Sequence, residues 1–298
     1  MSWTTIESDP GVFTSLVQSF GVSGVEFEEV FSLDFLPPSS FGLIFLFKYS
    51  KAGNTGAEAD TIVDDPDVWF AKQTVQNACA TQAILGVLLN TDGSAGKFDL
   101  GDRLGDFKSF TSALPSDMKG ESIGASDDIR VAHNSFTRPD PFVSDEKRAA
   151  TDDDDVFHFI AYVPVNGKVY ELDGLKSGPV FLGGAESNWQ DVAKSRIQAR
   201  ITRYSESEIK FNVLSVVPDK ALKIQEELKV EGADVASLQV QLEDEQDKRK
   251  KWDEENVRRK HNYVPFVIEL VKALAGNGQA DEMLKRGAER RKSKAGLS

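Results

Sequence analysis

The sequence predicts a mixed domain of class α+β that ends near Pro218 and is followed by a helical extension to Ser298. Before Pro218, short apolar runs alternate with clusters of Gly, Pro, Asn and Asp, as is typical of a domain that mixes strands and helices. After Pro218, apolar residues recur at three- and four-residue steps within a highly charged stretch, which indicates helices. We therefore expect two regions, residues 1–218 and residues 219–298.

The first expected element is a helix from Pro10 to about Phe20, with Asp9 as its N-cap and proline at its first position. The run Phe41–Phe47 has the length and aromatic content of a buried strand. A second helix is expected to begin at about Cys79, where a polar stretch gives way to apolar residues.

Three later apolar runs are expected to be strands: Val156–Pro164, Lys168–Leu172 and Phe211–Val217. Asn166-Gly167 joins the first two, and Asn-Gly between apolar runs is a strong hairpin signal. The segment Val143–Asp155 is polar, lacks periodicity and ends in four aspartates. We expect it to form a mobile surface loop directly before the strand that carries His158.

The extension contains a heptad-like apolar stripe formed by Ile224, Leu228, Val235, Leu238, Leu242 and Trp252. The stripe is interrupted by Glu231, Gly232, Glu245 and Arg249. A coiled coil here would therefore be imperfect. An apolar helix is expected after Pro265 and should stop at Gly276, whereas the basic stretch Lys285–Lys294 is expected to be loosely ordered.

Composition narrows the class of function. A net charge of −13 and a pI of about 4.8 argue against direct nucleic-acid binding, which requires excess lysine and arginine. The single cysteine cannot form an internal disulfide, which favours a reducing compartment. The N-terminus lacks the pattern of a signal peptide, and no window has the apolar length of a membrane span. We therefore expect a cytoplasmic and nuclear protein that does not bind membranes.

The cysteine, Cys79, lies at a predicted helix start, where backbone N–H groups and the helix dipole favour a thiolate. A nucleophilic cysteine needs a base, and the base needs an orienting group. His158 and Asp173 lie on neighbouring strands of the predicted hairpin, so we expect Nδ1–H of the histidine to donate to the carboxylate and Nε2 to face the sulfur. Gln73, together with the backbone N–H of Cys79, is a candidate oxyanion donor.

Each of these residues also has an ordinary structural explanation. A lone cysteine is more often inert, a histidine in an apolar strand is more often a core residue, and Asp in Asp-Gly usually forms a turn. The combination favours catalysis without settling it. His133 and His261 are assigned structural roles, because neither has a carboxylate in a comparable strand pair. No metal or cofactor is expected, because one cysteine and three scattered histidines show no ligand spacing.

At these residues the sequence resembles the ubiquitin C-terminal hydrolases, a family of papain-like cysteine peptidases. The matching stretches are Glu7–Phe13, Gly42–Phe47, Phe70–Gln73, Asn77–Ala83, His158–Phe159, Tyr162–Gly167 and Tyr170–Gly174. The resemblance implies a papain-like fold, with a central antiparallel sheet flanked by helices. It implies Cys79 as nucleophile, His158 as general base and acid, and Asp173 as the group that orients the histidine. It also implies Gln73 as oxyanion donor, ubiquitin as substrate, and a loop over about His133–Asp155 that crosses above the active site.

The stretch Arg258–Leu270 is similar to the tail of the proteasome-associated member of that family. This resemblance implies that the extension docks on a ubiquitin receptor of the proteasome's regulatory particle, with a subunit of a chromatin-remodelling complex as a competing partner. The alternative is a helix that packs on the chain's own catalytic domain.

Three functions stay open from the sequence. The first is a deubiquitinating cysteine peptidase that cleaves after the C-terminal glycine of ubiquitin. The second is a ubiquitin-binding scaffold whose active site is closed or depends on a partner. The third is a cysteine peptidase for another ubiquitin-like modifier.

Overall fold

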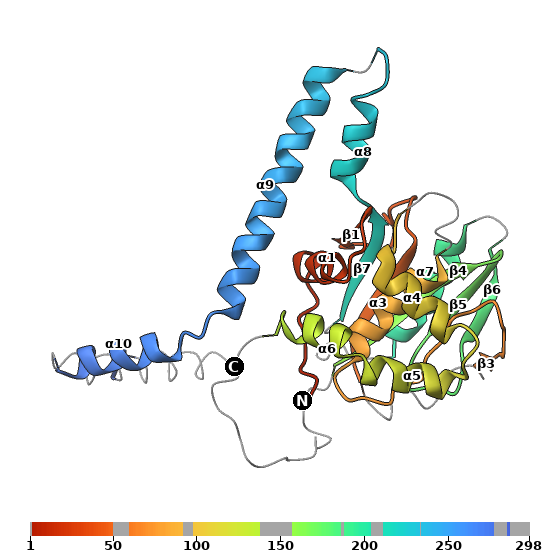
Figure 1. Ribbon diagram of the computed structural model, residues 1–298, viewed down its shortest axis with the longest axis horizontal. Helices are drawn as coiled ribbons and strands as arrows, with labels where there is room; N and C mark the ends of the chain where they lie inside the picture. The colour runs from red at the N-terminus through yellow and green to blue at the C-terminus, as the bar shows by residue number, and fades with distance from the viewer. Residues whose placement is uncertain are drawn as a thin grey trace. The chain divides into compact units, whose positions relative to one another are not determined.

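The computed structural model describes residues 2–49, 60–91, 98–137, 157–185, 188–203, 211–232, 234–276 and 285–286 (Figure 1). The chain divides into two compact units, the first formed by residues 1–137 and 148–259 and the second by residues 138–147 and 260–298. The predicted loop Val143–Asp155 lies outside the described residues, as does the basic stretch beyond Arg286. The predicted domain boundary at Pro218 stays a prediction.

The first unit contains these elements, in chain order: α1 (Pro10–Ser19), β1 (Val25–Glu29), β2 (Gly42–Lys48), β3 (Thr61–Ile62), α3 (Cys79–Asn90), α4 (Gly101–Thr111), α5 (Ser116–Ala125), α6 (Asp127–Asn134), β4 (Phe157–Val165), β5 (Lys168–Leu172), β6 (Val180–Gly184), α7 (Trp189–Ile201), β7 (Phe211–Pro218), α8 (Lys220–Glu227) and α9 (Val235–Lys260). The second unit contains α10 (Val264–Gly276).

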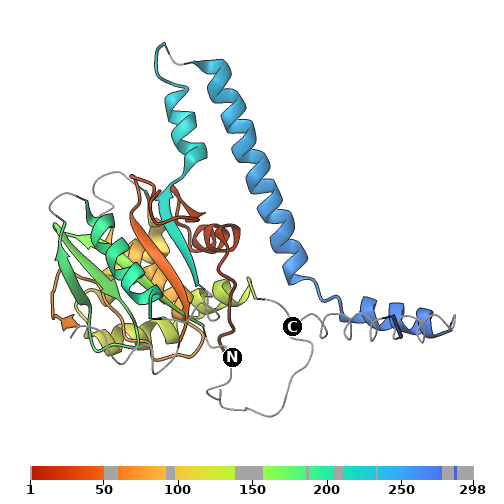
Figure 2. The same ribbon diagram turned by 180° about the vertical axis from the view of Figure 1, so that it is seen from behind.

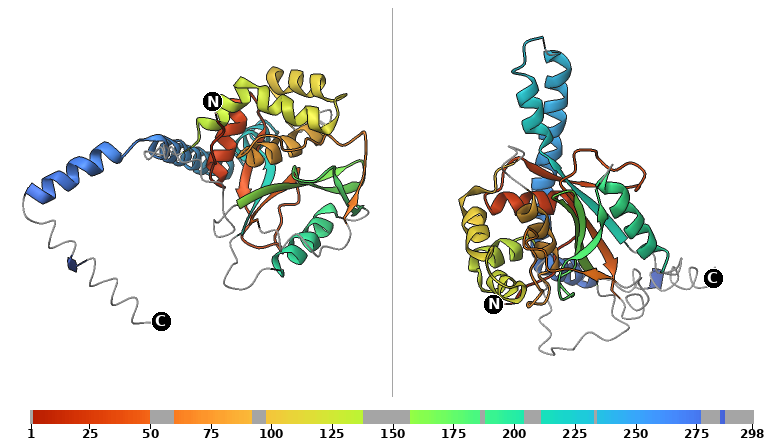
Figure 3. Two further views of the ribbon diagram at one scale, coloured as in Figure 1. Left: turned by 90° about the horizontal axis from the view of Figure 1, so that it is seen from below. Right: turned by 90° about the vertical axis from the view of Figure 1, so that its right-hand side faces the viewer.

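The seven strands form one sheet in the order β1-β7-β2-β4-β5-β6-β3, and every neighbouring pair is antiparallel. Among the strands that the structure describes, the last one, β7, therefore lies between the first two. Helices cover both faces of the sheet: in the left panel of Figure 3, α3 to α6 lie on one side and α7 lies on the other. The predicted class, a central antiparallel sheet flanked by helices, is confirmed.

Alternation along the strands explains these two layers, because successive side chains of a strand point to opposite faces. On β4, Phe159 and Ala161 belong to the larger core, which is shared with α1 and α3. Ile160 and Tyr162 belong to the smaller core, which is shared with α7. The central strands are thus apolar on both faces, which explains why strands such as β2 are continuous apolar runs in the sequence.

Local signals fixed several elements as expected. The side chain of Asp9 caps α1 by accepting a hydrogen bond from the backbone N–H of Val12 at 3.0 Å, and Pro10 is the first helical residue. Asn166 and Gly167 turn the β4–β5 hairpin with φ of 47° and 74°, because a tight turn of this kind needs positive φ at both positions. The strands β1, β3 and β6 were not predicted.

Within the first unit, helix α9 runs back beside α1, as Figures 1 and 2 both show. A Cβ atom added to Gly11 of α1 would lie 2.6 Å from the ring of Trp252, so only glycine permits this close approach. The side chain of Asn256 donates to the carbonyl of Gly11 at 3.3 Å. Arg249, which interrupts the apolar stripe in the sequence, lies between two carboxylates of the unit, Glu26 and Asp219, at 2.9 and 2.8 Å. Of the stripe residues, Ile224 is buried and Trp252 lies against Gly11, whereas Val235 is exposed.

Helix α10 occupies the interval expected for the apolar helix after Pro265. Its apolar side chains are exposed, with 64% exposure at Phe266 and 47% at Ile268. Among the helices that the structure describes, none combines the length and the apolar content that a bilayer crossing requires.

Candidate active site

Cys79 is the first residue of α3, and the sequence around it explains why its surroundings attract negative charge. The N-cap residue, Ala78, has no side chain that could satisfy the first backbone N–H groups of the helix. Asn77 adopts φ of 64°, a left-handed conformation that asparagine tolerates better than most residues, and its amide donates to the carbonyl of Trp3 at 3.1 Å. The ten residues that follow Cys79 are all buried, so the helix is held rigidly while the thiol stays partly exposed.

His158 and Asp173 are brought together by the β4–β5 hairpin. Asp173 follows the last residue of β5, and its Oδ1 accepts a hydrogen bond from Nε2 of His158 at 2.7 Å. Both side chains are almost fully buried, with 5% and 1% exposure. The ring of Phe47, the partner of His158 on β2, packs edge-on against the imidazole with ring centroids 5.8 Å apart. The imidazole is therefore held from two sides.

The expected roles of the two ring nitrogens were wrong. Nε2 bonds Asp173, so Nδ1 is the nitrogen that remains for the sulfur of Cys79. The reason is geometric: Asp173 lies beyond the end of β5, diagonally across from His158, and the far nitrogen of the ring reaches it. The sequence spacing brought the residues together but did not determine the rotation of the ring.

The electrostatics of the pair favour an imidazolium. Burial lowers the pKa of His158, but hydrogen bonds and charge attraction from Asp173 and Cys79 outweigh it and raise this pKa to about 9. Burial of Asp173 would raise the pKa of its carboxyl, but the contact with His158 and the backbone N–H of Leu175 lower it overall. At neutral pH the site therefore holds a protonated histidine between a carboxylate and the cysteine sulfur.

Gln73 lies beside Cys79 in the same narrow cavity of about 10 Å³, room for about one water molecule. The cavity is lined by Trp69, Phe70, Ala71, Gln73, Cys79, Gln82, Ala83, Gly86, Phe159, Leu172 and Gly174. Nε2 of Gln73 donates to the carbonyl of Val75 at 3.1 Å. An amide nitrogen carries two hydrogens, so one of them is left for an oxyanion. The backbone N–H of Gln73 donates to the carbonyl of Gly174 at 2.8 Å, which joins this segment to the residue after Asp173.

A family model described as "Ubiquitin carboxyl-terminal hydrolase, family 1" matches residues 3–202, which contain all four predicted site residues. The chain belongs to this family. A second model, described as "Ubiquitin carboxyl-terminal hydrolases", matches residues 235–279, which contain α9 and α10. The chain is therefore a cysteine-type deubiquitinase, and the resemblance inferred from its motifs is confirmed.

Relatives of this hydrolase match it over nearly the whole chain. Ubiquitin carboxyl-terminal hydrolase 2 of Schizosaccharomyces pombe is 46% identical over 92% of this chain and 91% of its own. Ubiquitin carboxyl-terminal hydrolase isozyme L5 of Dictyostelium discoideum is 38% identical over 96% of this chain and 95% of its own. Among solved structures, UCH37 of Trichinella spiralis bound to ubiquitin vinyl methyl ester aligns with a TM-score of 0.70 and 38% identity, covering 84% of this chain and 99% of that one.

The two other histidines of the hydrolase lie outside the site. His133 is fully buried at the end of α6, where Nε2–H donates to the carbonyl of Thr4 at 2.5 Å and Nδ1 accepts from the hydroxyl of Thr81 at 2.7 Å. Burial lowers its pKa, so it is a neutral structural residue. The expected crossover loop, His133–Asp155, begins inside this ordered helix end, and its residues 138–155 lie outside the described residues. His261 packs against the ring of Tyr263 in the second unit.

Sequence reasoning missed a buried cluster of charges beside Asp173. Glu171 lies within the apolar strand β5, and this isolated charge among apolar residues was the available signal. Its partners could not be found from the sequence, because Arg196 and Arg200 come from α7, beyond β6. Within the described residues, no group of His, Cys, Asp or Glu has the arrangement of a metal site.

Proposed function

We propose that this deubiquitinase cleaves the bond after the C-terminal glycine of ubiquitin, with Cys79 as its nucleophile. The thiolate attacks the glycine carbonyl, and the backbone N–H of Cys79 together with the Gln73 amide stabilises the oxyanion. The His158 imidazolium gives its proton to the leaving amine, and the C–N bond breaks to leave a thioester. His158 then takes a proton from water, which attacks the thioester and releases ubiquitin with a free carboxylate.

The observation that carries this proposal is the buried hydrogen bond between His158 and Asp173 beside Cys79. Asp173 holds the imidazole in one orientation and stabilises its charged form, as an acid that must protonate an amine requires. The narrowness of the cavity at Cys79 also supports a ubiquitin tail as substrate, because its Gly-Gly end has no side chains to accommodate. The relative from Trichinella spiralis, which was solved bound to ubiquitin vinyl methyl ester, supports the same substrate.

The test is mass spectrometry of the protein after incubation with ubiquitin that carries a C-terminal electrophile, alongside Cys79→Ala. We expect one covalent adduct on the wild-type chain and none on the variant, which should still bind ubiquitin. Binding without an adduct on the wild-type chain would refute the peptidase and favour the ubiquitin-binding scaffold. Faster labelling by the corresponding derivative of another ubiquitin-like modifier would refute ubiquitin as the preferred substrate.

For the second unit we propose that α10 docks on a ubiquitin receptor of the proteasome's regulatory particle, in the cytoplasm and the nucleus, and that a subunit of a chromatin-remodelling complex competes for it. Support comes from the exposed apolar side chains of α10, among them Phe266, Ile268 and Val271. The match of residues 235–279 to the second family model agrees with a specialised role for this part of the chain.

The docking proposal is tested by calorimetry with the purified receptor. Phe266→Asp should weaken binding by at least tenfold and leave ubiquitin cleavage by the isolated hydrolase unchanged. Lys272→Met, on the same helix, is the control and should bind like the wild type. Equal affinities for all three proteins would contradict docking through α10.

A further inference from the structure

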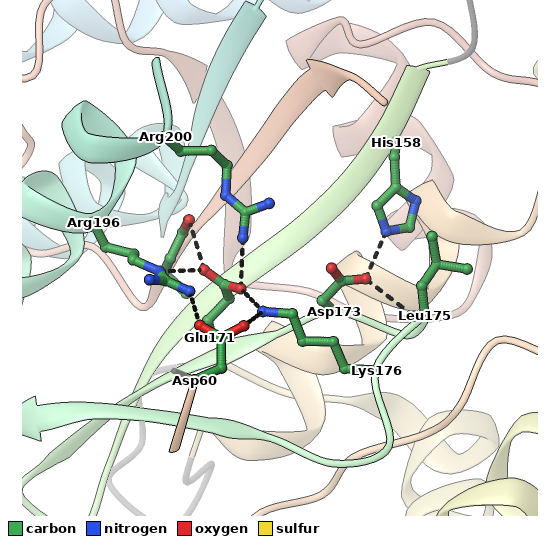
Figure 4. A network of polar contacts seen from close by, with 9 residues as sticks. Asp60, His158, Glu171, Asp173, Leu175, Lys176, Arg196 and Arg200 are labelled. Carbon is green, nitrogen blue, oxygen red and sulfur yellow. Dashed lines mark hydrogen bonds and ion pairs between the residues drawn. The ribbon is translucent and has the colours of Figure 1, made fainter. Parts of the chain in front are cut away.

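A cluster of buried charges lies two residues from Asp173 (Figure 4). Glu171 has no exposed surface, and its carboxylate accepts hydrogen bonds from Lys176 at 2.5 Å, Arg200 at 2.7 Å and Arg196 at 3.0 Å. Burial would raise the pKa of Glu171, but the charges of Arg200, Lys176 and Arg196 lower it to about 2. The carboxylate is therefore ionised at neutral pH, where it attracts these three cations.

Lys176 is the member of this cluster that belongs to the catalytic turn. Its backbone N–H donates to the carbonyl of Asp173 at 2.9 Å, which closes the turn. Its ammonium reaches back past Asp173 to Glu171, and a second bond to Asp60 at 2.8 Å fixes the same ammonium. Lys176 thus bonds both Asp173, through its backbone, and Glu171, through its side chain.

The conformation of this turn decides where the Asp173 carboxylate lies. The oxygen that accepts from His158 also accepts from the backbone N–H of Leu175 at 3.0 Å, so a change in the turn moves this oxygen. The carbonyl of Gly174 in the same turn holds the backbone of Gln73 at 2.8 Å. The turn therefore carries the group that orients the histidine and anchors the candidate oxyanion donor.

We propose that Lys176 is a positioning residue of the active site: its ion pair with Glu171 fixes the turn 173–176 and thereby holds Asp173 on His158 and Gln73 beside Cys79. This inference rests on the proposed function for the roles of those residues. It assigns to Lys176 no contact with substrate. A displacement of about 1 Å in a catalytic group is enough to cost about 100-fold in rate, so a loosened turn has a measurable effect.

Removal of the ammonium should leave the fold intact. In Lys176→Met, Glu171 keeps both arginines, so no buried carboxylate loses all its partners. The Lys176 side chain is 17% exposed, and methionine fills similar space. Lys168→Met is the control, because Lys168 lies on β5 with Glu171 but pairs with Asp65 at 3.1 Å at the far end of the hairpin. Lys176→Arg is a second variant that keeps a cation within reach of Glu171.

The experiment measures kcat and KM on a fluorogenic ubiquitin amide, and the rate of Cys79 alkylation by iodoacetamide across pH. Because the chain has one cysteine, alkylation reports on Cys79 alone. For Lys176→Met we expect kcat to fall by about 10- to 100-fold with little change in KM. The limb of the alkylation profile that reports deprotonation of His158 should move to lower pH, because a weakened bond to Asp173 no longer stabilises the imidazolium. Lys168→Met and Lys176→Arg should match the wild type.

The proposal is overturned if Lys176→Met keeps the wild-type kcat or the wild-type alkylation profile, or if Lys176→Arg shows the same defects as Lys176→Met. A lower kcat with an unchanged profile would mean that Lys176 serves only the stability of the fold. Iodoacetamide needs no ubiquitin, so the two proposals can fail separately. Suppose that the wild-type chain does not cleave ubiquitin, but the alkylation profiles of the wild type and Lys176→Met differ as expected. The proposed function would then be refuted, whereas the positioning role of Lys176 would be supported.

Discussion

Arg249→Met tests whether α9 is part of the stable core of the catalytic unit. Its partner Glu26 has no exposed surface, and the ion pairs that the structure describes for this carboxylate come from two residues of α9, Arg249 at 2.9 Å and Lys248 at 3.4 Å. Removing one member of a fully buried ion pair costs about 3–5 kcal/mol. Here Arg249 is 25% exposed and Lys248 remains, so we expect a loss of about 2 kcal/mol. For a unit of this size that corresponds to a fall in Tm of about 4–8 °C.

The loss should depend on pH with a defined sign. Burial raises the pKa of Glu26 above its ordinary value of 4.5, although Lys248 and Arg249 oppose the shift. A carboxyl with a raised folded pKa favours folding below its unfolded pKa, and that advantage disappears as the pH rises through the folded value. Arg249→Met raises the folded pKa further, so its penalty should be largest at pH 7.5 and smaller near pH 5.

The assay is thermal unfolding at both pH values, with Lys250→Met on the exposed face of α9 as control. Glu26→Gln combined with Arg249→Met should recover part of the loss, because the charge of Glu26 is then gone while Asp219 still lacks its arginine. A fall in Tm below 1 °C, or an equal fall at both pH values that the double variant does not relieve, would refute the reasoning.

Three further predictions concern the active site. Asp173→Asn should fold normally, but its kcat should be lower by a factor of about 10²–10⁴. The pKa of His158 should drop from about 9, and NMR of the imidazole ring can measure this change. An unchanged pKa would contradict Asp173 as the partner of His158. Gln73→Ala should lower kcat by about 100-fold, whereas an increase in KM alone would make Gln73 a residue that binds the ubiquitin tail. Gly174→Ala should reduce activity, because the added Cβ would lie 2.2 Å from Nε2 of Gln82 and 3.0 Å from Cβ of Gln73; wild-type kinetics would show that the cavity can relax.

Short-range signals were sufficient for much of the fold. A capped helix start at Asp9, a continuous apolar strand and an Asn-Gly turn each depend on residues within a few positions of one another. The proximity of His158 to Asp173 followed from the hairpin, because its register is fixed by the turn. The orientation of the imidazole did not follow, since it depends on a side-chain torsion that spacing leaves free.

The charged residues that the sequence analysis misjudged are paired with residues far away in the chain. Arg249 looked like an interruption of an apolar stripe because its partners Glu26 and Asp219 lie on β1 and at the start of α8. Glu171 looked anomalous within β5 because two of its cations come from α7. A charge that is paired across the fold cannot be distinguished by local pattern from one that is exposed. Such residues become intelligible only when the neighbouring elements are known.

The strand order has a consequence for biosynthesis. Cys79 is synthesised early, and its proposed base, His158, follows 79 residues later. The strand β7 must still enter the sheet between β1 and β2 before the sheet is complete. A chain that ends before residue 158 therefore carries Cys79 without the proposed base and without the carboxylate that orients it. The contact between Asn256 of α9 and Gly11 of α1 spans 245 residues, so it can form only after almost the whole unit has been synthesised. On the proposed roles, a chain must therefore extend through Asp173 before it holds the nucleophile, its base and the orienting carboxylate together.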